Sequence, residues 1–387
     1  MIYKPYFLND VYNNSKKELF TVISTFAGGG GSSTGYKLAG GKVLAMNEFV
    51  DEAVKTYTEN YPDVKVISGD IKTINASDFF DITNIKKHEL DIFDGSPPCS
   101  AFSVAGQCSK GWNKEKTYSD NKKVKNIEDL FLEFIRIADD LQSKVIIIEN
   151  VVGLTIGDSK SKLYEMLNSL DDIGYYATYK ILNASNFDTP QARKRVFIIG
   201  VRKDVLDDLD LPDIILNSIV YPKPNDYFYS IKDAINDIDN DAEEEDMLLK
   251  CCSTGFHAKF VPLLEFNPIK AISPGDIEFR DVNPKGSFFS MIRPAPLKPC
   301  PTITQRGQQT RVSGILHYSK NRKLTVKELK RVQGLPDDYI LTGNFNKQAE
   351  RICRMVAPLC MKALSSHIYE TILKPYNNLE KKTINLT

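Results

Sequence analysis

The first 200 residues alternate short apolar segments with segments of helical periodicity. The apolar segments predict strands at 19–26, 42–49, 64–68, 90–95, 144–151, 176–184 and 195–201. Helical apolar spacing lies between them at 51–61, 126–141 and 161–174. Near-continuous apolar strands that alternate with helices are typical of a parallel sheet covered on both faces. The sequence therefore predicts an α/β fold built on a doubly wound, mostly parallel sheet.

This alternation stops near residue 205, which predicts a change of domain. We expect a first domain over 1–204 and a smaller domain with little regular structure over 205–317, where prolines and aspartates are frequent. Helical patterns return over 318–387, and these C-terminal helices are expected to pack back on the first domain. One helix is predicted at 324–334, with Thr325 as its N-cap and Gly334 as its C-terminal residue. Another is predicted at 351–372, followed by a frayed tail.

Composition places the chain among soluble globular proteins, with 42% hydrophobic residues, 26% charged residues and zero net charge. The N-terminus has no secretory signal pattern, and no apolar stretch approaches the roughly 20 residues that span a bilayer, so a cytoplasmic location is expected. Seven cysteines without a C-x-x-C pair argue against a disulfide framework and a structural zinc site. The basic segments 305–314 and 317–331 suit a phosphate backbone, although a solvated surface explains such runs equally well.

A glycine-rich segment, FAGGGGSSTG, follows the first predicted strand at 26–35. Glycines between a strand and a helix let the backbone approach a ligand and direct amide groups at it. The glycines stand at Gly28, Gly30, Gly31 and Gly35. This is not the dinucleotide pattern G-x-G-x-x-G, because Ser33 occupies its third glycine position. A plain tight turn is the alternative interpretation.

Two acidic residues strengthen the ligand interpretation. Glu48 ends the second predicted strand, twenty positions after Gly28, where a carboxylate can hold ribose hydroxyls. Asp70 ends the third strand and can accept a hydrogen bond from an adenine amino group. Each could also be a helix cap, Asp70 especially. Together, at successive strand ends, they favour a cofactor that contains adenosine.

Six motifs then occur in the order of one known family: FAGGGG, GSPPCSAFS, IIIENV, QARKRVFIIG, RPAPLKPCPTI and LTVKELKRVQGLPDDY. The chain resembles the cytosine-C5 DNA methyltransferases from residue 19 to about 370, interrupted by a variable region at roughly 205–290. The resemblance implies the class I S-adenosylmethionine-dependent methyltransferase fold, S-adenosylmethionine as cofactor, and a target-recognition domain at 205–317.

The resemblance also implies which residues contact the cofactor. The phenylalanine of the first motif, Phe26, would pack on the adenine ring. The full predicted set is Phe26, Ala27, Gly28, Gly30, Gly31, Glu48, Phe49, Asp70, Ile71, Pro98 and Val356. Three positions depart from the family pattern: Ser24 replaces an aspartate, Arg354 replaces an asparagine of the last motif, and Ile127 replaces an arginine.

Cytosine C5 is a poor nucleophile until a thiolate adds to C6, and cysteine is suited to that addition. The resemblance assigns the thiolate to Cys99, which follows Pro97 and Pro98, whose rings fix the backbone. Glu149, at the end of a buried strand, would donate a proton or hydrogen bond to N3. The family's first arginine, which reaches the cytosine O2, corresponds to Arg193, and Arg195 would support the glutamate. Packing, capping or ordinary ion pairing are the alternatives for these residues.

A carbon inside a duplex is unreachable, so the target cytosine must be flipped out of the helix. We expect the segment 103–122, with Trp112, to close over the flipped base, although an ordinary surface loop is the alternative. The predicted DNA contacts are Ser103, Gln107, Gln191 and Arg306.

The sequence predicts a monomeric DNA (cytosine-5-)-methyltransferase that acts on double-stranded DNA. It would belong to a restriction-modification system with a cognate restriction endonuclease, or act alone as an orphan modification enzyme. One alternative is a transfer-RNA cytosine-C5 methyltransferase, which generally lacks a long specificity region. A second is a catalytically silent DNA-binding relative. A nicotinamide dehydrogenase is disfavoured by the glycine pattern and by the lack of a well-placed histidine.

Overall fold

The computed structural model describes residues 2–98, 116–117, 123–124, 129–255, 258–264, 276–285, 291–305, 307–308, 310 and 314–384. It consists of two compact units. Unit 1 comprises Met1–Leu8, Asn183–Arg193 and Pro224–Cys360, and unit 2 comprises Asn9–Leu182, Lys194–Lys223 and Met361–Thr387. These divisions differ from the predicted boundaries after residues 204 and 317, because the chain passes between the units several times and residues 318–360 belong to unit 1.

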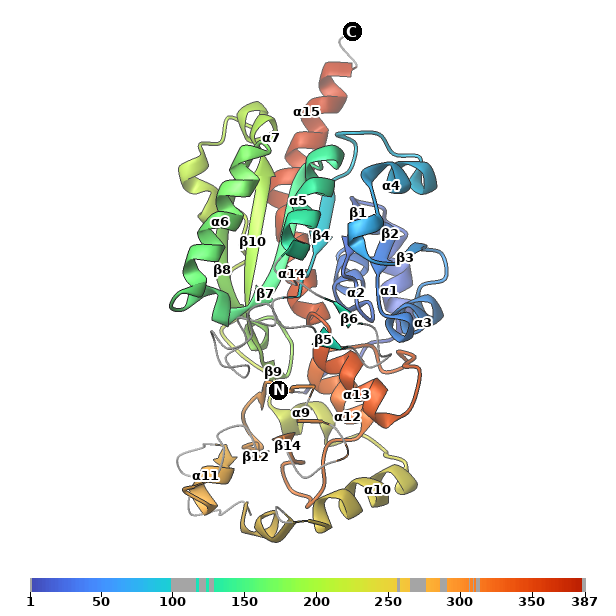
Figure 1. Cartoon of the computed structure of the whole chain (residues 1–387), viewed down its shortest axis with the longest axis vertical. Helices are drawn as coiled ribbons and strands as arrows, with labels where there is room; N and C mark the ends of the chain where they lie inside the picture. Colours follow the sequence, from blue (N-terminus) through green and yellow to red (C-terminus); the bar gives the residue numbers. More distant parts are fainter. Residues whose placement is uncertain are drawn as a thin grey trace. The chain divides into compact units, whose positions relative to one another are not determined.

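Unit 2 contains a seven-stranded sheet in the order β3-β2-β1-β4-β7-β10-β8 (Figure 1). The strands are β1 (Thr21–Thr25), β2 (Lys42–Glu48), β3 (Lys65–Ser68), β4 (Ile92–Gly95), β7 (Val145–Val151), β8 (Tyr175–Asn183) and β10 (Lys194–Arg202). The pairs from β3 to β7 are parallel, whereas β10 is antiparallel to β7. The predicted mostly parallel α/β sheet is therefore confirmed, and each predicted strand is present.

The helices of unit 2 are α1 (Leu8–Ser15), α2 (Gly31–Leu38), α3 (Asp51–Asn60), α4 (Ala76–Thr83), α5 (Asp129–Leu141), α6 (Ser159–Asp172), α7 (Lys203–Asp208), α8 (Leu216–Ile219), α14 (Pro358–Ile368) and α15 (Lys374–Ile384). Residues of α4, α5 and α6 form one core cluster with alternate strand residues such as Ile146 and Ile148. Phe134 of α5 stacks on Phe93 of β4, with ring centroids 4.6 Å apart. Val145 and Ile147 point to the opposite face and are also fully buried, so both faces of the sheet are covered.

The topology places a switch point between β1 and β4. From β1 the chain adds β2 and β3 on one side, and it then returns to add β4 and β7 on the other. Ligands of open α/β sheets bind at the carboxyl ends of the strands beside such a point. The carboxyl ends of β1, β2, β4 and β7 are therefore where a site is expected.

Unit 1 contains the helices α9 (Ile231–Ile235), α10 (Ala242–Ser253), α11 (Phe279–Val282), α12 (Val326–Gln333) and α13 (Phe345–Arg354). Its strands are β9 (Gln191–Ala192), β11 (Ile277–Glu278), β12 (Met291–Arg293), β13 (Cys300–Pro301) and β14 (Gly314–Ile315). Strands β11, β12 and β14 form a small sheet, and β9 pairs with β13. The predicted helix at 324–334 is confirmed as α12, with Thr325 and Glu328 in a capping box and Gly334 at φ 77°.

The C-terminal prediction was wrong in two respects. The helix expected at 351–372 is interrupted between Arg354 and Pro358, because proline cannot donate a helical hydrogen bond and disfavours helix before it. The tail expected to fray is helix α15, which continues to Ile384. Within unit 2, Lys144 donates to Asn377 at 2.9 Å and lies over the Tyr376 ring at 5.3 Å, so tertiary contacts hold this helix.

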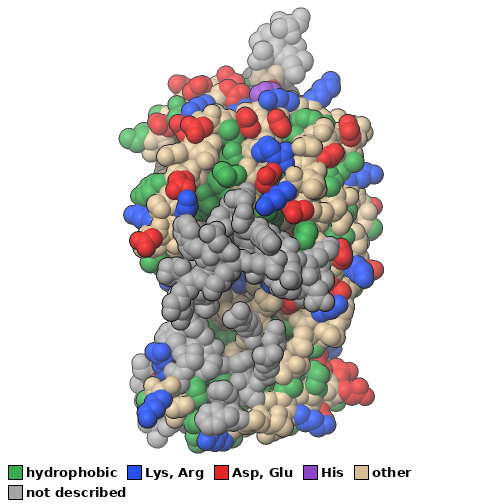
Figure 2. All heavy atoms as spheres, in the orientation of Figure 1, with side chains coloured by type: hydrophobic (Ala, Val, Ile, Leu, Met, Phe, Trp, Pro, Cys, Tyr) green, Lys and Arg blue, Asp and Glu red, His purple; other side chains and the backbone are tan. Residues whose placement is uncertain are grey.

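Acidic and basic side chains are mixed over the face drawn in Figure 2, in keeping with the zero net charge. Among the helices that the structure describes, none combines the length and the apolar character needed to cross a membrane.

Candidate active site

The glycine-rich segment forms the turn between β1 and α2. Gly28 and Gly30 have left-handed φ values of 58° and 93°, which glycine adopts without steric cost. Phe26 also has a positive φ of 52°, which is uncommon for a side chain of its size. A Cβ atom placed on Gly28 would meet no atom within 4 Å, so the turn borders open space. This geometry lets a ligand approach the backbone closely.

Glu48 fixes this turn to the carboxyl end of β2. Its Oε2 accepts a hydrogen bond from the Gly28 amide at 2.7 Å. Its Oε1 accepts from the amides of Phe49 and Val50, each at 2.8 Å. A carboxylate offers about four acceptor positions, so these amides leave about one for a ligand hydroxyl.

Asp70 lies in the turn after β3, where it caps a short 3₁₀ helix (Ile71–Thr73) by accepting from the Lys72 amide at 3.1 Å. The capping role considered for Asp70 is thus present in the structure. Ile71 belongs to the core cluster, and Phe26 and Phe49 are partly buried against the same cluster. The carboxyl ends of β1, β2 and β3 therefore combine apolar side chains with two carboxylates.

Asp94, which the sequence analysis did not single out, is the most buried carboxylate of this region, with 1% of its surface exposed. It lies on β4 in register with Ser24 of β1. Its Oδ2 accepts from the Ser24 hydroxyl at 2.6 Å, and its Oδ1 accepts from the Tyr36 hydroxyl at 2.9 Å. Burial raises the pKa of Asp94 to about 6, against the lowering effect of the hydroxyls of Ser24, Tyr36 and Ser32. An acidic residue inside an apolar strand was the available sequence signal.

The chain beyond β4 leads to Pro97 and Pro98. The Asn150 side chain donates to the Pro97 carbonyl at 3.2 Å, which ties this segment to the end of β7. Pro98 is half-buried. Cys99, the predicted nucleophile, lies outside the described residues, as do Ser103, Gln107, Trp112, Ile127 and Arg306.

Glu149 and Arg195 form an ion pair near the carboxyl end of β7. The Arg195 Nε lies 3.1 Å from the Glu149 Oε1, across the antiparallel pair of β7 and β10. The two side chains are 11% and 19% exposed, so water screens the pair weakly. Burial lowers the pKa of Arg195, and the Glu149 carboxylate opposes that shift. The structure thus places a guanidinium against the predicted acid.

Gln191, Arg193 and Arg195 do not share one continuous strand. Gln191 lies in β9, Arg193 follows it, and Arg195 lies in β10. Gln191 is fully buried, and its amide donates to Gln333 at 2.8 Å. Its Oε1 accepts from the Ile303 amide at 3.1 Å. These contacts within unit 1 occupy the side chain that was predicted to contact DNA.

Arg193 is also buried in unit 1, with 4% of its surface exposed. Its charge lowers the pKa of Cys353, which burial raises overall to about 12. Nearby, Arg354 donates to Gln305 at 2.7 Å and pairs with Glu350 at 3.0 Å. The arginine that departs from the family pattern therefore has protein partners, and Val356 is buried two residues later.

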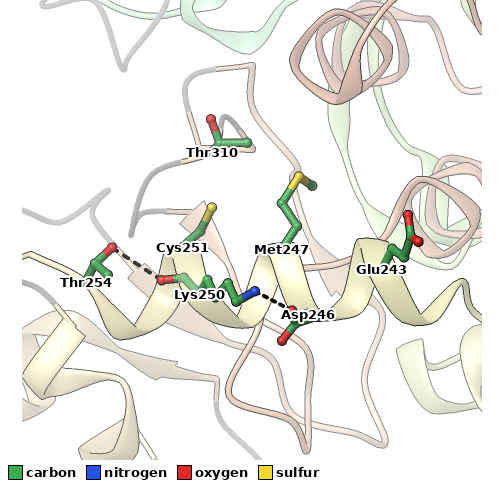
Figure 3. A pocket seen from close by; sticks show the side chains of 7 residues that line it. All are labelled: Glu243, Asp246, Met247, Lys250, Cys251, Thr254 and Thr310. Carbon is green, nitrogen blue, oxygen red and sulfur yellow. Dashed lines mark hydrogen bonds and ion pairs between the residues drawn. The ribbon is translucent and has the colours of Figure 1, made fainter.

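An open hollow of about 500 Å³ lies in unit 1 along α10 (Figure 3). Lys250 turns along the helix toward Asp246, with which it pairs at 2.6 Å. Of the predicted site residues that the structure describes, none lines this hollow.

Comparison with known proteins identifies the family. Residues 20–370 match the family model of the C-5 cytosine-specific DNA methylases. The chain belongs to this family. It is thus a DNA (cytosine-5-)-methyltransferase with the class I methyltransferase fold.

Related proteins align with this methyltransferase over most of its length. It is 29% identical over 361 residues to the type II methyltransferase M1.HphI of Haemophilus parahaemolyticus, covering 92% of this chain and 88% of the relative. It is 27% identical to M.HpaII of Haemophilus parainfluenzae, covering 94% and 93%. Among solved structures, the Dnmt2 methyltransferase of S. pombe shares the fold with a TM-score of 0.56 and 16% identity, over 92% of this chain and 99% of that one.

Proposed function

We propose that this methyltransferase uses S-adenosylmethionine to methylate C5 of a cytosine flipped out of a specific duplex DNA sequence, through a covalent bond between Cys99 and C6. The observation that carries the proposal is the arrangement at the sheet's carboxyl edge. The glycine turn bound by Glu48 lies at the ends of β1 and β2, and the Glu149–Arg195 pair lies at the end of β7.

The residues around the glycine turn fit S-adenosylmethionine. The open space beside Gly28 lets a ligand lie close to the protein backbone. The partly buried rings of Phe26 and Phe49 provide an apolar surface for adenine. Glu48 has about one acceptor position left for a ribose hydroxyl. Asp70 keeps its second carboxylate oxygen for the adenine amino group while Oδ1 caps the helix. When bound, S-adenosylmethionine supplies the electrophilic methyl group.

Pro98 and Val356 complete the proposed cofactor contacts, together with Ala27, Gly30, Gly31 and Ile71. Arg354 is not included in this set, because its guanidinium contacts Glu350 and Gln305.

The catalytic residues act on the pyrimidine ring. The Cys99 thiolate adds to C6, which makes C5 an enamine carbon and therefore nucleophilic. Glu149 donates a proton or hydrogen bond at N3 as negative charge develops there. Arg195 holds the Glu149 carboxyl in place, and Arg193 binds the O2 atom. After methyl transfer, loss of the C5 proton and departure of the thiolate restore the aromatic ring.

DNA recognition is proposed for the domain at 205–317, with Ser103, Gln107 and Arg306 at the flipped base and its neighbours. Gln191 acts in this proposal through its contacts with Gln333 and Ile303, which hold the segment before Arg193. The segment 103–122 would close over the base. Because the two relatives above are type II methyltransferases, we propose that the enzyme belongs to a restriction-modification system and is paired with a restriction endonuclease. As separate parts of the proposal, it is monomeric and cytoplasmic.

The test uses S-adenosylmethionine labelled with tritium in its methyl group, incubated with duplex DNA, with transfer RNA and without nucleic acid. Wild type, Cys99→Ala and the matched control Cys251→Ala, a free cysteine of α10, are compared. We expect label in DNA for wild type and the control, and none for Cys99→Ala. Label in RNA alone, or in no acceptor, would overturn the proposal.

A further inference from the structure

We propose that Asp94 is a positioning residue for the cofactor turn, holding the first turns of α2 against β1 and β4 so that the Gly28–Gly31 backbone keeps its binding shape. This inference rests on the proposed use of S-adenosylmethionine. It concerns a residue outside the predicted catalytic and cofactor sets.

The Asp94 carboxylate connects three elements of unit 2. Asp94 accepts hydrogen bonds from Ser24 on β1 and from Tyr36 on α2, and it also interacts with Ser32 on α2. Ser32 and Tyr36 are four residues apart and therefore lie on one face of the helix. One carboxylate thus connects two strands and two turns of the helix that follows the glycine turn.

Helix α2 lacks a side-chain cap of its own. Its N-cap is Gly30, which has no side chain to satisfy the first amides. The other polar side chains of its first turns are held by α3 and its end, because Ser33 accepts from the Tyr57 hydroxyl at 2.9 Å and Thr34 contacts the Tyr61 hydroxyl at 2.5 Å. Asp94 supplies the corresponding attachment to the sheet, and its negative charge near the helix N-terminus is favourable.

Burying a carboxylate at position 94 costs free energy. Asp94 is 1% exposed, and its described partners are hydroxyl groups, which stabilise a buried charge less than a cation does. Ser24 stands where the family resemblance expects an aspartate. Because Ser24 and Asp94 are register partners on neighbouring parallel strands, the carboxylate lies one strand away from the position where the resemblance expects it.

The decisive variant is therefore Ser24→Asp combined with Asp94→Ser, which places the carboxylate on β1. It is compared with Asp94→Ala and with wild type. The matched control is Asp91→Asn, directly before the same strand, where Asp91 accepts from the Thr21 amide at 2.8 Å and pairs with Lys144 at 3.1 Å. For each protein, the dissociation constant of S-adenosylhomocysteine is measured by calorimetry and the melting temperature by circular dichroism.

We expect Asp94→Ala to weaken S-adenosylhomocysteine binding about tenfold or more, the effect of losing one hydrogen bond to a charged group. The exchanged double variant should recover most of this loss. Asp91→Asn should lower the melting temperature and leave the affinity unchanged. If Asp94→Ala does not fold, Tyr36→Phe and Ser24→Ala remove single hydroxyls, and each should weaken binding by a smaller factor.

Wild-type affinity in folded Asp94→Ala would overturn the inference and leave the proposed function intact. A double variant that recovers the melting temperature without the affinity would also overturn it, because the attachment of α2 to the sheet would then be restored without restoring the binding shape of the turn. A wild-type protein that binds neither S-adenosylhomocysteine nor S-adenosylmethionine would overturn both proposals.

Discussion

Replacing Asp94 by asparagine should change how the stability of unit 2 depends on pH. The pKa of Asp94 is about 6 in the folded protein, raised from 3.8 by burial. For an acid whose folded pKa is raised, the folded state binds the proton more tightly than the unfolded chain does. Protonation of Asp94 therefore stabilises the folded state relative to the unfolded chain. The free energy of unfolding falls as pH rises from about 4 to 6, because Asp94 loses its proton over this range.

The magnitude follows from the two pKa values. A shift of about two units corresponds to about 3 kcal/mol between full protonation and full ionisation of Asp94. Roughly half of this loss in the free energy of unfolding has already occurred at pH 5, so a further loss of about 1 to 2 kcal/mol is expected between pH 5 and pH 8. Asp94→Asn lacks the titrating proton and should not show this component.

The assay is urea denaturation of wild type and Asp94→Asn at pH 5, 6, 7 and 8, followed by circular dichroism. The difference in unfolding free energy, wild type minus variant, should fall by about 1 to 2 kcal/mol from pH 5 to pH 8. Asp140→Asn, at an exposed position of α5, is the control, and its difference from wild type should stay constant. A wild-type-minus-Asp94→Asn difference that is also constant, or that rises with pH, would refute the reasoning.

Four other substitutions test other parts of the structure. Arg195→Gln leaves the Glu149 carboxylate without its ion pair and should destabilise the protein by up to about 3 kcal/mol in urea denaturation, whereas adding Glu149→Gln should recover part of the loss. If the loss of unfolding free energy in the double variant equalled the sum of the losses in the two single variants, a direct interaction between Arg195 and Glu149 would be contradicted. Thr325→Ala removes the capping box of α12 and should cost about 1 kcal/mol by the same assay, with Thr325→Ser close to wild type. Phe134→Ala removes a fully buried ring stacked on Phe93 and should cost about 3 to 5 kcal/mol, so an unchanged melting temperature would be inconsistent with the packing. Pro98→Ala relaxes the chain before Cys99 and should lower the methylation rate about tenfold with little change in melting temperature; a lower melting temperature at full rate would show that the proline is only scaffolding.

Part of the candidate site could be predicted because its signals are local in sequence. The glycine pattern of 26–35 and the acid at the end of the second strand identified the turn and Glu48. The structure then showed the two joined by one hydrogen bond of 2.7 Å. Other features carried no local signal. Gln191 has the residue type of a base-contacting side chain, and only the positions of Gln333 and Ile303 show that its amide is occupied.

The sequence by itself determined the strands of the large sheet, the helices α3, α5 and α6, and the limits of α12, because apolar periodicity and capping act over a few residues. Tertiary structure decided that β10 runs antiparallel to β7, that α15 packs against Lys144, and that Asp94 accepts a hydrogen bond from Ser24. Each of these joins residues that are distant along the chain, by roughly 50 to 230 positions. Their contact depends on how sheet neighbours and packed helices come together, which the spacing of residues within one segment does not encode.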